Sequence, residues 1–188
     1  AARAFAERDP VLAADARQRA EEDWRFGLEE TRAKDDEATE TSAYGVLAGV
    51  ELLRLTGDAQ YGESAAFLAE RLLAVQERRV LPDLDLPLAG YFYASPGRRE
   101  ILHYVHRAAD QAPVDALASL ASVLPGHPAF LRWYAAVVLH SEHYARPLAG
   151  LTEPWHILPN GVHRLRGLGT DGDDAVRREQ VRRGFLVG

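Results

Sequence analysis

The chain contains no cysteine, no excess of basic residues and no long apolar run. Without cysteine it forms no disulfide, although this absence leaves the cellular compartment open. Its 22 basic and 28 acidic side chains give a net charge of −6, so it has no overall basic excess to release counterions from nucleic acid. No apolar segment reaches the length that crosses a bilayer. We therefore expect neither a nucleic-acid nor a membrane partner, and the localisation stays unassigned.

Several sequence motifs of catalytic sites are also missing. There is no GxSxG nucleophile elbow, and the glycine-rich run GLGTDGDD at 167–174 lacks the lysine and the flanking strand of a phosphate-binding loop. His103 with His106, and His140 with His143, have the spacing of three that shares a helix face. Because the chain has no cysteine and no HExxH spacing, we interpret these histidines as polar groups of a cleft or surface. The charged run 29–40 is interpreted as a solvated helix end and loop, with an acidic cation site as the alternative. We predict no metal and no cofactor.

The length and the two ends bear on domain organisation. With 188 residues, 47% of them hydrophobic, the chain is long enough to bury the core of one domain. Residues 1–7 resemble the last turns of a helix, and the final RRGFLVG is an apolar segment without a polar tail. We therefore expect residues 1–188 to form a single partial domain of about three hairpins, truncated at both ends.

Capping residues mark the first helices. Asp9 followed by Pro10 is typical of a helix start, and apolar residues from Val11 to Leu28 then recur at helical spacing. The next helix, 41–55, is apolar on nearly every side, which predicts burial on most sides. Gly57 ends it and Asp58 caps its successor, whose apolar residues repeat at spacings of three and four.

Two further helices are expected in the second half. One begins between 101 and 107 and ends near 124, with Pro113 as either a kink or the true first turn. Another follows Gly126, His127 and Pro128 and ends near Tyr144. Because each start is followed by paired helices, the pattern predicts an all-α fold of antiparallel α-hairpins.

The stretch 89–111, AGYFYASPGRREILHYVHRAADQ, departs most from plain amphipathic helix. Long loops in compact domains are usually functional or disordered, and the aromatic content here argues against disorder. Sugars require planar hydrogen-bonding groups for their hydroxyls and aromatic faces for their C–H surfaces. The alternative is a helix start with local ion pairs and aromatic rings that belong to the core. The predicted sugar-binding residues are Tyr91, Tyr93, His106, Arg107, Asp110, Gln111, Trp155 and His163.

The pair of carboxylates that glycoside hydrolysis requires cannot be assigned from the sequence. Asp110 and Glu153 are the acids that stand among cleft-type residues. Asp110 is the candidate for a catalytic role, and the complete catalytic set is unknown.

Parts of the chain resemble a known group of enzymes. AFAERDPVLAADARQRAEEDW at 4–24 and LLRLTGDAQYGESAAFLAERL at 52–72 resemble helical hairpins of family 9 glycoside hydrolases. The stretches GYFY, ILHYVHRAADQ, LPNGVHRL and VRRGFLVG resemble a bacterial, cellulase-like branch of the same superfamily. The resemblance implies the six-hairpin (α/α)6 toroid and an oligo- or polysaccharide substrate, with about half a toroid present. The family's acidic base pair and its C-terminal general acid have no matching motif, so no catalytic residue is carried over. We therefore expect this chain by itself to show no glycosidase activity.

Two other functions remain open. The GD..Y turn is shared with tetratricopeptide-like repeats, so a helical-repeat interaction module without chemistry is one alternative. Such a module should have short, uniform turns, whereas this chain has long loops around 78–106 and 147–172. A lyase or epimerase on the same toroid is the other alternative, because such enzymes use histidine, arginine and tyrosine.

Overall fold

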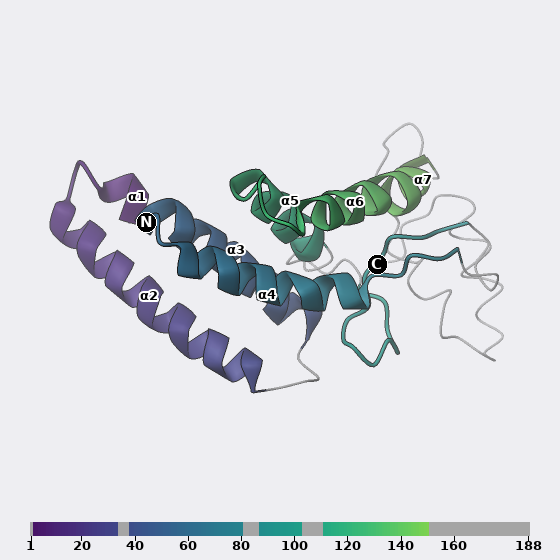
Figure 1. The fold of residues 1–188 in the computed structure, drawn as a ribbon, viewed down its shortest axis with the longest axis horizontal. Coiled ribbons are helices and arrows are strands. Elements are labelled where there is room, and N and C mark those ends of the chain that lie inside the picture. The colour runs from purple at the N-terminus through teal and green to yellow at the C-terminus, as the bar shows by residue number, and fades with distance from the viewer. Residues whose placement is uncertain (1, 34–37, 81–86, 103–110, 151–188) are drawn as a thin grey trace.

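The computed structural model describes residues 2–33, 38–80, 87–102 and 111–150, and this part of the chain is mostly helical (Figure 1). It contains no strand, and its only extended pairings are two isolated antiparallel bridges, Gln76 with Phe92 and Tyr93 with Ile101. The all-α prediction is therefore confirmed for these residues. In chain order the elements are α1 (Ala2–Phe5), α2 (Pro10–Arg32), α3 (Thr39–Thr56), α4 (Ala59–Val75), α5 (Ala112–Val123), α6 (Phe130–His140), the π-helical turn η1 (Ser141–Ala145) and α7 (Arg146–Gly150).

The predicted caps lie at the ends of the helices. Pro10 is in the first turn of α2, and the Asp9 side chain accepts a hydrogen bond of 3.0 Å from the Leu12 backbone N–H. Gly57 ends α3 in the left-handed conformation with φ of 73°, and its N–H donates to the Leu53 carbonyl. The Asp58 side chain then caps α4. These boundaries are confirmed within about two residues.

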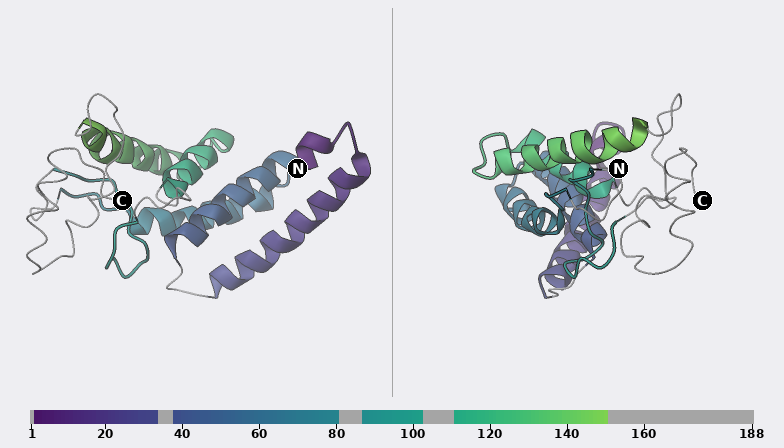
Figure 2. Two further views of the ribbon diagram at one scale, coloured as in Figure 1. Left: turned by 180° about the vertical axis from the view of Figure 1, so that it is seen from behind. Right: turned by 90° about the vertical axis from the view of Figure 1, so that its right-hand side faces the viewer.

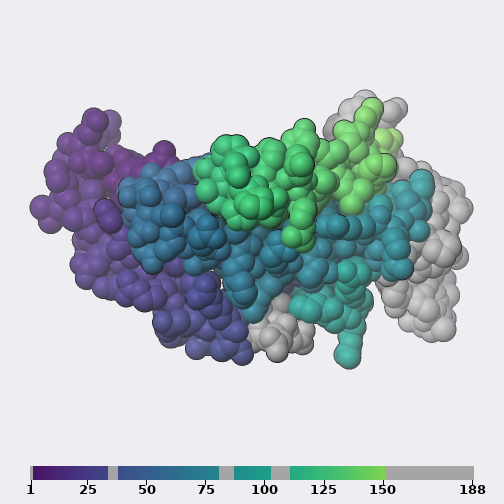
Figure 3. All heavy atoms as spheres, in the orientation of Figure 1, coloured from purple at the N-terminus to yellow at the C-terminus, as the bar shows by residue number. Residues whose placement is uncertain are grey.

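The hairpin of α3 and α4 forms the centre of the molecule, and α5 packs against α3 (Figures 1 and 2). Gly49 permits the close approach of α3 and α4, because an added Cβ would lie 3.0 Å from Ala65 Cβ and 3.1 Å from the Tyr61 carbonyl oxygen. Helices α5 to α7 lie together over one side of this hairpin (Figure 3). Fully buried core side chains include Val46, Val50, Leu68, Leu72, Leu117, Leu120 and Trp133.

Trp24 is one of the side chains that attach helix α2 to the bundle. The Trp24 indole N–H donates to the Gly45 carbonyl at 3.2 Å, and its ring meets Tyr61 edge-on with centroids 5.1 Å apart. The apolar spacing that begins at Val11 does not become a core seam, since Val11 is 80% exposed and Thr31 is the one fully buried residue of this helix. None of the described helices combines the length and hydrophobicity needed to cross a membrane.

Pro113 lies in the first turn of α5, which confirms one of the two roles expected for it. The helix expected to run to Tyr144 instead changes at Ser141 into the π-helical turn η1. At this turn the His143 carbonyl accepts a hydrogen bond of 3.0 Å from the Ala89 N–H. The segment 87–93 is thereby fixed to the end of the bundle at which α4 ends.

Candidate functional site

A pocket of about 670 Å³ opens among α3, α5 and the junction of α6 with η1. Its residues follow helical spacing, which places them on one face of each helix. On α5 and its N-terminal cap, for example, Gln111, Asp115 and Ala118 are four and three residues apart. The described residues that line the pocket are Tyr44, Leu47, Gln111, Ala112, Val114, Asp115, Ala118, His140, Ser141 and Ala145.

His140 is the most buried polar side chain of this pocket, with 7% of its surface exposed. Its Nδ1 lies 3.0 Å from the Gly90 carbonyl oxygen, which is only an acceptor, so Nδ1 carries the proton and donates. Among the described residues, Nε2 has no hydrogen-bond partner. Burial lowers the pKa of His140 below 6.5, and the opposing bond to Gly90 only partly offsets this. The imidazole is therefore neutral near pH 7, and Nε2 offers a lone pair.

This burial gives His140 a predictable effect on stability. Its pKa is lower in the folded than in the unfolded chain, so the unfolded chain takes up the proton first as the pH falls below 6.5. The neutral His140 side chain therefore contributes to the free energy of unfolding above pH 6.5, and this contribution declines as the pH falls below 6.5. We expect the wild type to lose more unfolding free energy than His140→Asn between about pH 7.5 and about pH 5.5, as measured by urea denaturation.

Asparagine suits this test because its amide can still donate to the Gly90 carbonyl without titrating. His143→Asn is the matched control, since His143 is exposed and lies three residues further along the chain, in the π-helical turn η1. This control should keep the wild-type pH slope. An equal slope in the wild type and His140→Asn would contradict the buried, neutral assignment.

The other polar groups of the pocket come from different helices. Tyr44 of α3 is 44% exposed and provides an aromatic face, while Gln111 and Asp115 provide an amide and a carboxylate at the start of α5. Ser141 adds a hydroxyl group beside His140. Asp115 is the one carboxylate among the described residues that line the pocket, so these residues form no acid–base pair of carboxylates.

The predicted site residues that the structure describes are divided between the pocket and the core. Gln111 lines the pocket. Tyr91 and Tyr93 are buried, and their rings pack edge-on with centroids 5.7 Å apart. The second reading of the aromatic residues, as core, therefore fits the placement of these two rings. The other predicted residues lie outside the described part of the chain: His106, Arg107, Asp110, Trp155 and His163, together with His103 and Glu153.

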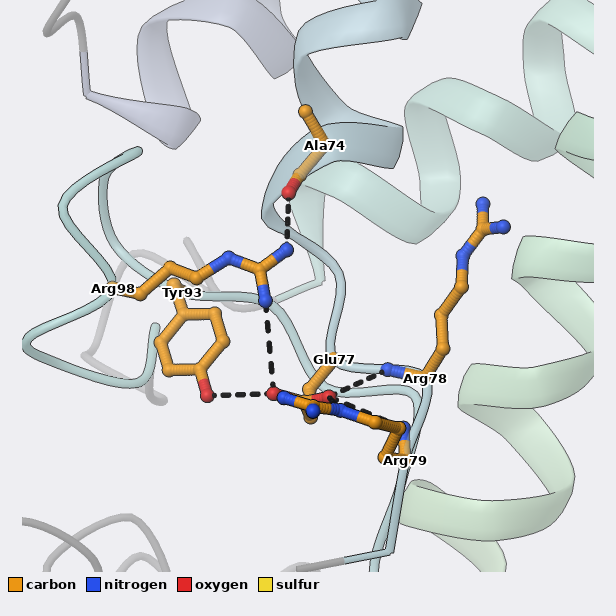
Figure 4. A network of polar contacts seen from close by, with 6 residues as sticks. All are labelled: Ala74, Glu77, Arg78, Arg79, Tyr93 and Arg98. Carbon is orange, nitrogen blue, oxygen red and sulfur yellow. Dashed lines mark hydrogen bonds and ion pairs between the residues drawn. The ribbon is translucent and has the colours of Figure 1, made fainter.

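The Tyr93 hydroxyl leads to a buried carboxylate that the sequence analysis did not single out (Figure 4). It donates to Glu77 Oε2 at 2.9 Å, and the Glu77 side chain is 2% exposed. Glu77 Oε1 accepts from the backbone N–H groups of Arg78 and Arg79 and from Arg79 Nε at 3.3 Å. Glu77 follows Gln76, the C-cap residue of α4, so its carboxylate joins this helix end to the segment that contains Tyr93.

Arg98 closes the other side of this network (Figure 4). Its Nη2 donates to the Ala74 carbonyl at 2.6 Å, Nη1 lies 3.7 Å from Glu77 Oε2, and the guanidinium stands 5.3 Å from the centroid of the Tyr93 ring. These contacts hold Arg98 at the unusual φ of 51°. In the sequence, Glu77 stands between an apolar helix and two arginines, in QERR at 76–79. That pattern alone does not indicate that the Glu77 carboxylate is buried.

The two histidines of the pair that the structure describes have different surroundings. His140 is buried with Nδ1 bound to a carbonyl, whereas His143 is exposed. Within the described ranges, no three side chains of histidine, aspartate or glutamate are grouped as metal ligands.

Comparison with known proteins does not place the chain in a family. No protein-family model matches it, and neither a curated protein nor a solved structure gives a significant match.

Proposed function

We propose that this chain binds an oligo- or polysaccharide in the pocket among α3, α5 and η1, as part of a glycoside hydrolase related to family 9. The observation that supports this proposal is the lining itself, where the exposed Tyr44 ring and the polar groups of Gln111, Asp115 and His140 border one volume of about 670 Å³. In this proposal the antiparallel helices are hairpins of an (α/α)6 toroid. The sequence resemblance suggests that arrangement, and the all-α fold is compatible with it.

The chemistry of the lining suits neutral hydroxyl groups. Nε2 of neutral His140 can accept a hydrogen bond from a sugar hydroxyl, and the Asp115 carboxylate can accept further hydrogen bonds. The Gln111 amide can both donate and accept. The Tyr44 ring is available to the C–H face of a pyranose. Binding sites for small molecules commonly combine an apolar wall with a few polar groups that fix orientation.

We expect binding without turnover from this chain alone. Hydrolysis by either stereochemical route uses two carboxyl groups across the scissile bond, and the pocket has one among its described residues. The test is incubation of the full chain with oligosaccharides and analysis of the products. Hydrolysis by the chain itself would overturn the assignment as a binding part, and eliminated or epimerised products would favour the lyase or epimerase alternative.

Replacement of Tyr44 should separate sugar binding from general stability. We expect Tyr44→Ala to weaken binding of the best oligosaccharide about ten-fold, which corresponds to about 1.4 kcal/mol for a lost aromatic face. Isothermal titration calorimetry with gluco-, xylo- and chito-oligosaccharides measures the affinity. Tyr134→Ala is the matched control, because Tyr134 is 56% exposed on α6 and does not line the pocket. Equal affinity of the two variants would contradict the proposal, and so would binding of no sugar by the wild type.

A helical-repeat interaction module is the second candidate, and the exposed apolar residues of α2 favour it. Val11 and Phe26 are largely exposed, and a second pocket of about 410 Å³ lies between α2 and α3. This reading predicts no sugar affinity in the calorimetric experiment, so the same measurement discriminates the two functions.

A further inference from the structure

A third pocket, polar and of about 450 Å³, lies at the C-terminal end of α4, beside the Glu77 network. It shares no described residue with the pocket proposed for sugar. Four of its lining side chains are arginines and two are glutamates. The described residues around it are Glu70, Leu73, Ala74, Gln76, Glu77, Arg78, Arg79, Arg98 and Arg132.

The charges of this pocket do not balance. Four guanidinium groups face two carboxylates, which leaves two positive charges in excess. The carbonyl groups at the end of α4 add partial negative charge, but Arg98 covers one of them through its bond to the Ala74 carbonyl. The protein as a whole has a net charge of −6, so a local positive excess is opposite in sign to the bulk.

The two glutamates hold particular arginines. Glu70 binds Arg132 through both Nη groups, at 2.9 and 2.7 Å. Glu77 binds Arg79 through Nε, at 3.3 Å, and pairs with Arg98 at 3.7 Å. Burial by itself would raise the pKa of Glu77, but the hydrogen bonds from Arg79 and the charges of Arg79 and Arg98 lower it overall, so this carboxylate stays ionised.

These pairings leave specific donors available. The Arg78 guanidinium has no partner among the described residues, and its side chain extends away from Glu77 (Figure 4). Arg79 uses Nε for Glu77, so its two Nη groups also have no described partner. Arg78 and Arg79 are consecutive, and Glu77 fixes the backbone N–H groups of both. A planar guanidinium presents paired donors that match the oxygens of phosphate or carboxylate.

We propose that this pocket binds a phosphate dianion, either free or as the phosphoryl group of a small molecule, with Arg78 and Arg79 as its donors. A dianion matches the excess of two positive charges, whereas a carboxylate would neutralise only one. Because the donors are partly exposed, the affinity should be modest and should fall as salt is added. Glu77 acts as a positioning residue, since it orients Arg79 without needing to touch the ligand.

Inorganic phosphate is the first probe. The full chain is titrated with phosphate near pH 7.5 at constant ionic strength, and backbone amide shifts are followed by NMR. We expect saturable shifts around residues 74–79, and we expect Arg78→Gln to weaken binding about three- to ten-fold. Arg25→Gln is the control, because Arg25 is an exposed arginine of α2 without a described hydrogen bond, and it should bind as the wild type does.

Additional arms distinguish the sources of the anion. Tighter binding of glycerol phosphate than of inorganic phosphate, with glycerol inactive, would assign the site to a phosphorylated small molecule, and the reverse order would assign it to free phosphate. Acetate that binds as tightly as phosphate would overturn the dianion assignment. Equal effects of phosphate and chloride, or an Arg78→Gln variant that binds phosphate unchanged, would overturn the site itself. Because Tyr44 is not in this pocket, Tyr44→Ala should bind phosphate normally, so failure of either proposal leaves the other one testable.

Discussion

Gly90→Ala is expected to destabilise the protein by about 2–5 kcal/mol, the sum of a left-handed backbone penalty and a collision in a packed region. Gly90 has φ of 86°, and a Cβ at this position would collide with the carbonyl oxygen of Leu139 and lie 2.8 Å from the backbone nitrogen of His140. These atoms belong to the helix backbone of α6, which cannot rotate away as a side chain could. Chemical denaturation of the wild type and the variant measures the loss.

Gly57→Ala is the matched control for this prediction. Gly57 also has a positive φ, of 73°, but no atom lies within 4 Å of the position that a Cβ would take. It should therefore show only the backbone penalty of about 1–2 kcal/mol. Similar losses for the two variants would show that the contact of Gly90 with α6 contributes nothing to stability.

The Gly90 contact also bears on the pocket. The Gly90 carbonyl accepts hydrogen bonds from His140 Nδ1 at 3.0 Å and from Gln76 Nε2 at 3.1 Å. A displacement of this carbonyl would release the bond that fixes the tautomer of His140. Any Gly90→Ala protein that remains folded should therefore bind sugar more weakly than Gly57→Ala.

Glu77→Gln is expected to destabilise the protein by about 2–4 kcal/mol at neutral pH. The Glu77 carboxylate is buried, receives hydrogen bonds from Tyr93 and from Arg78 and Arg79, and pairs with Arg98. Glu77 is the buried member of this set, whereas Arg79 and Arg98 are partly exposed. A neutral amide in its place removes the charge that the buried Tyr93 hydroxyl and the two backbone N–H groups bind, which costs more than the loss of a surface pair. Urea denaturation near pH 7 measures the difference in unfolding free energy.

The pH dependence of this effect has a definite sign. The pKa of Glu77 in the folded chain lies below the ordinary value of 4.5, so its contribution to stability is present above pH 4.5 and is lost as the pH falls through the folded pKa. The difference between the wild type and Glu77→Gln should therefore shrink in acid. Denaturation curves collected from neutral pH to below pH 4 follow this change.

Glu70→Gln provides the comparison for Glu77→Gln. Glu70 forms a bidentate pair with Arg132, at 2.9 and 2.7 Å, but both side chains are about half exposed. An exposed pair of this kind contributes about 0–1 kcal/mol. An equal loss for the two variants would show that the burial of Glu77 is not what makes its network strong.

The helices could be predicted from local sequence because their signals act over a few residues. Asp9 caps a helix through a backbone N–H three residues away, and Gly57 and Asp58 separate α3 from α4 through local backbone geometry. Pro113 marks the first turn of α5 for the same reason, since it lacks the N–H that an interior position requires. The all-α class follows from these signals and from helical periodicity.

The candidate site could be predicted only in part. Gln111 was included because it belongs to a dense polar stretch, and it lines the pocket. Tyr91 and Tyr93 were included for their aromatic rings, but ring type does not tell whether a face is open, and both rings are buried. His140 was interpreted as a polar histidine of a cleft or surface. Tyr44 lies in the helix at 41–55, for which the sequence predicts burial on most sides, yet its ring is exposed at the pocket. Its exposure depends on where α5 and η1 lie.

The sequence by itself therefore determined where α2 begins and where α3 and α4 begin and end, and that the described chain is all-α. Only the tertiary structure decided which side chains meet. Glu77 and Tyr93 are 16 residues apart, His140 and Gly90 are 50 apart, and Trp24 reaches Gly45 across 21 residues. Capping depends on groups within one helical turn, whereas burial, a shifted pKa and a shared pocket depend on contacts between distant segments, and a single sequence contains no local signal for them.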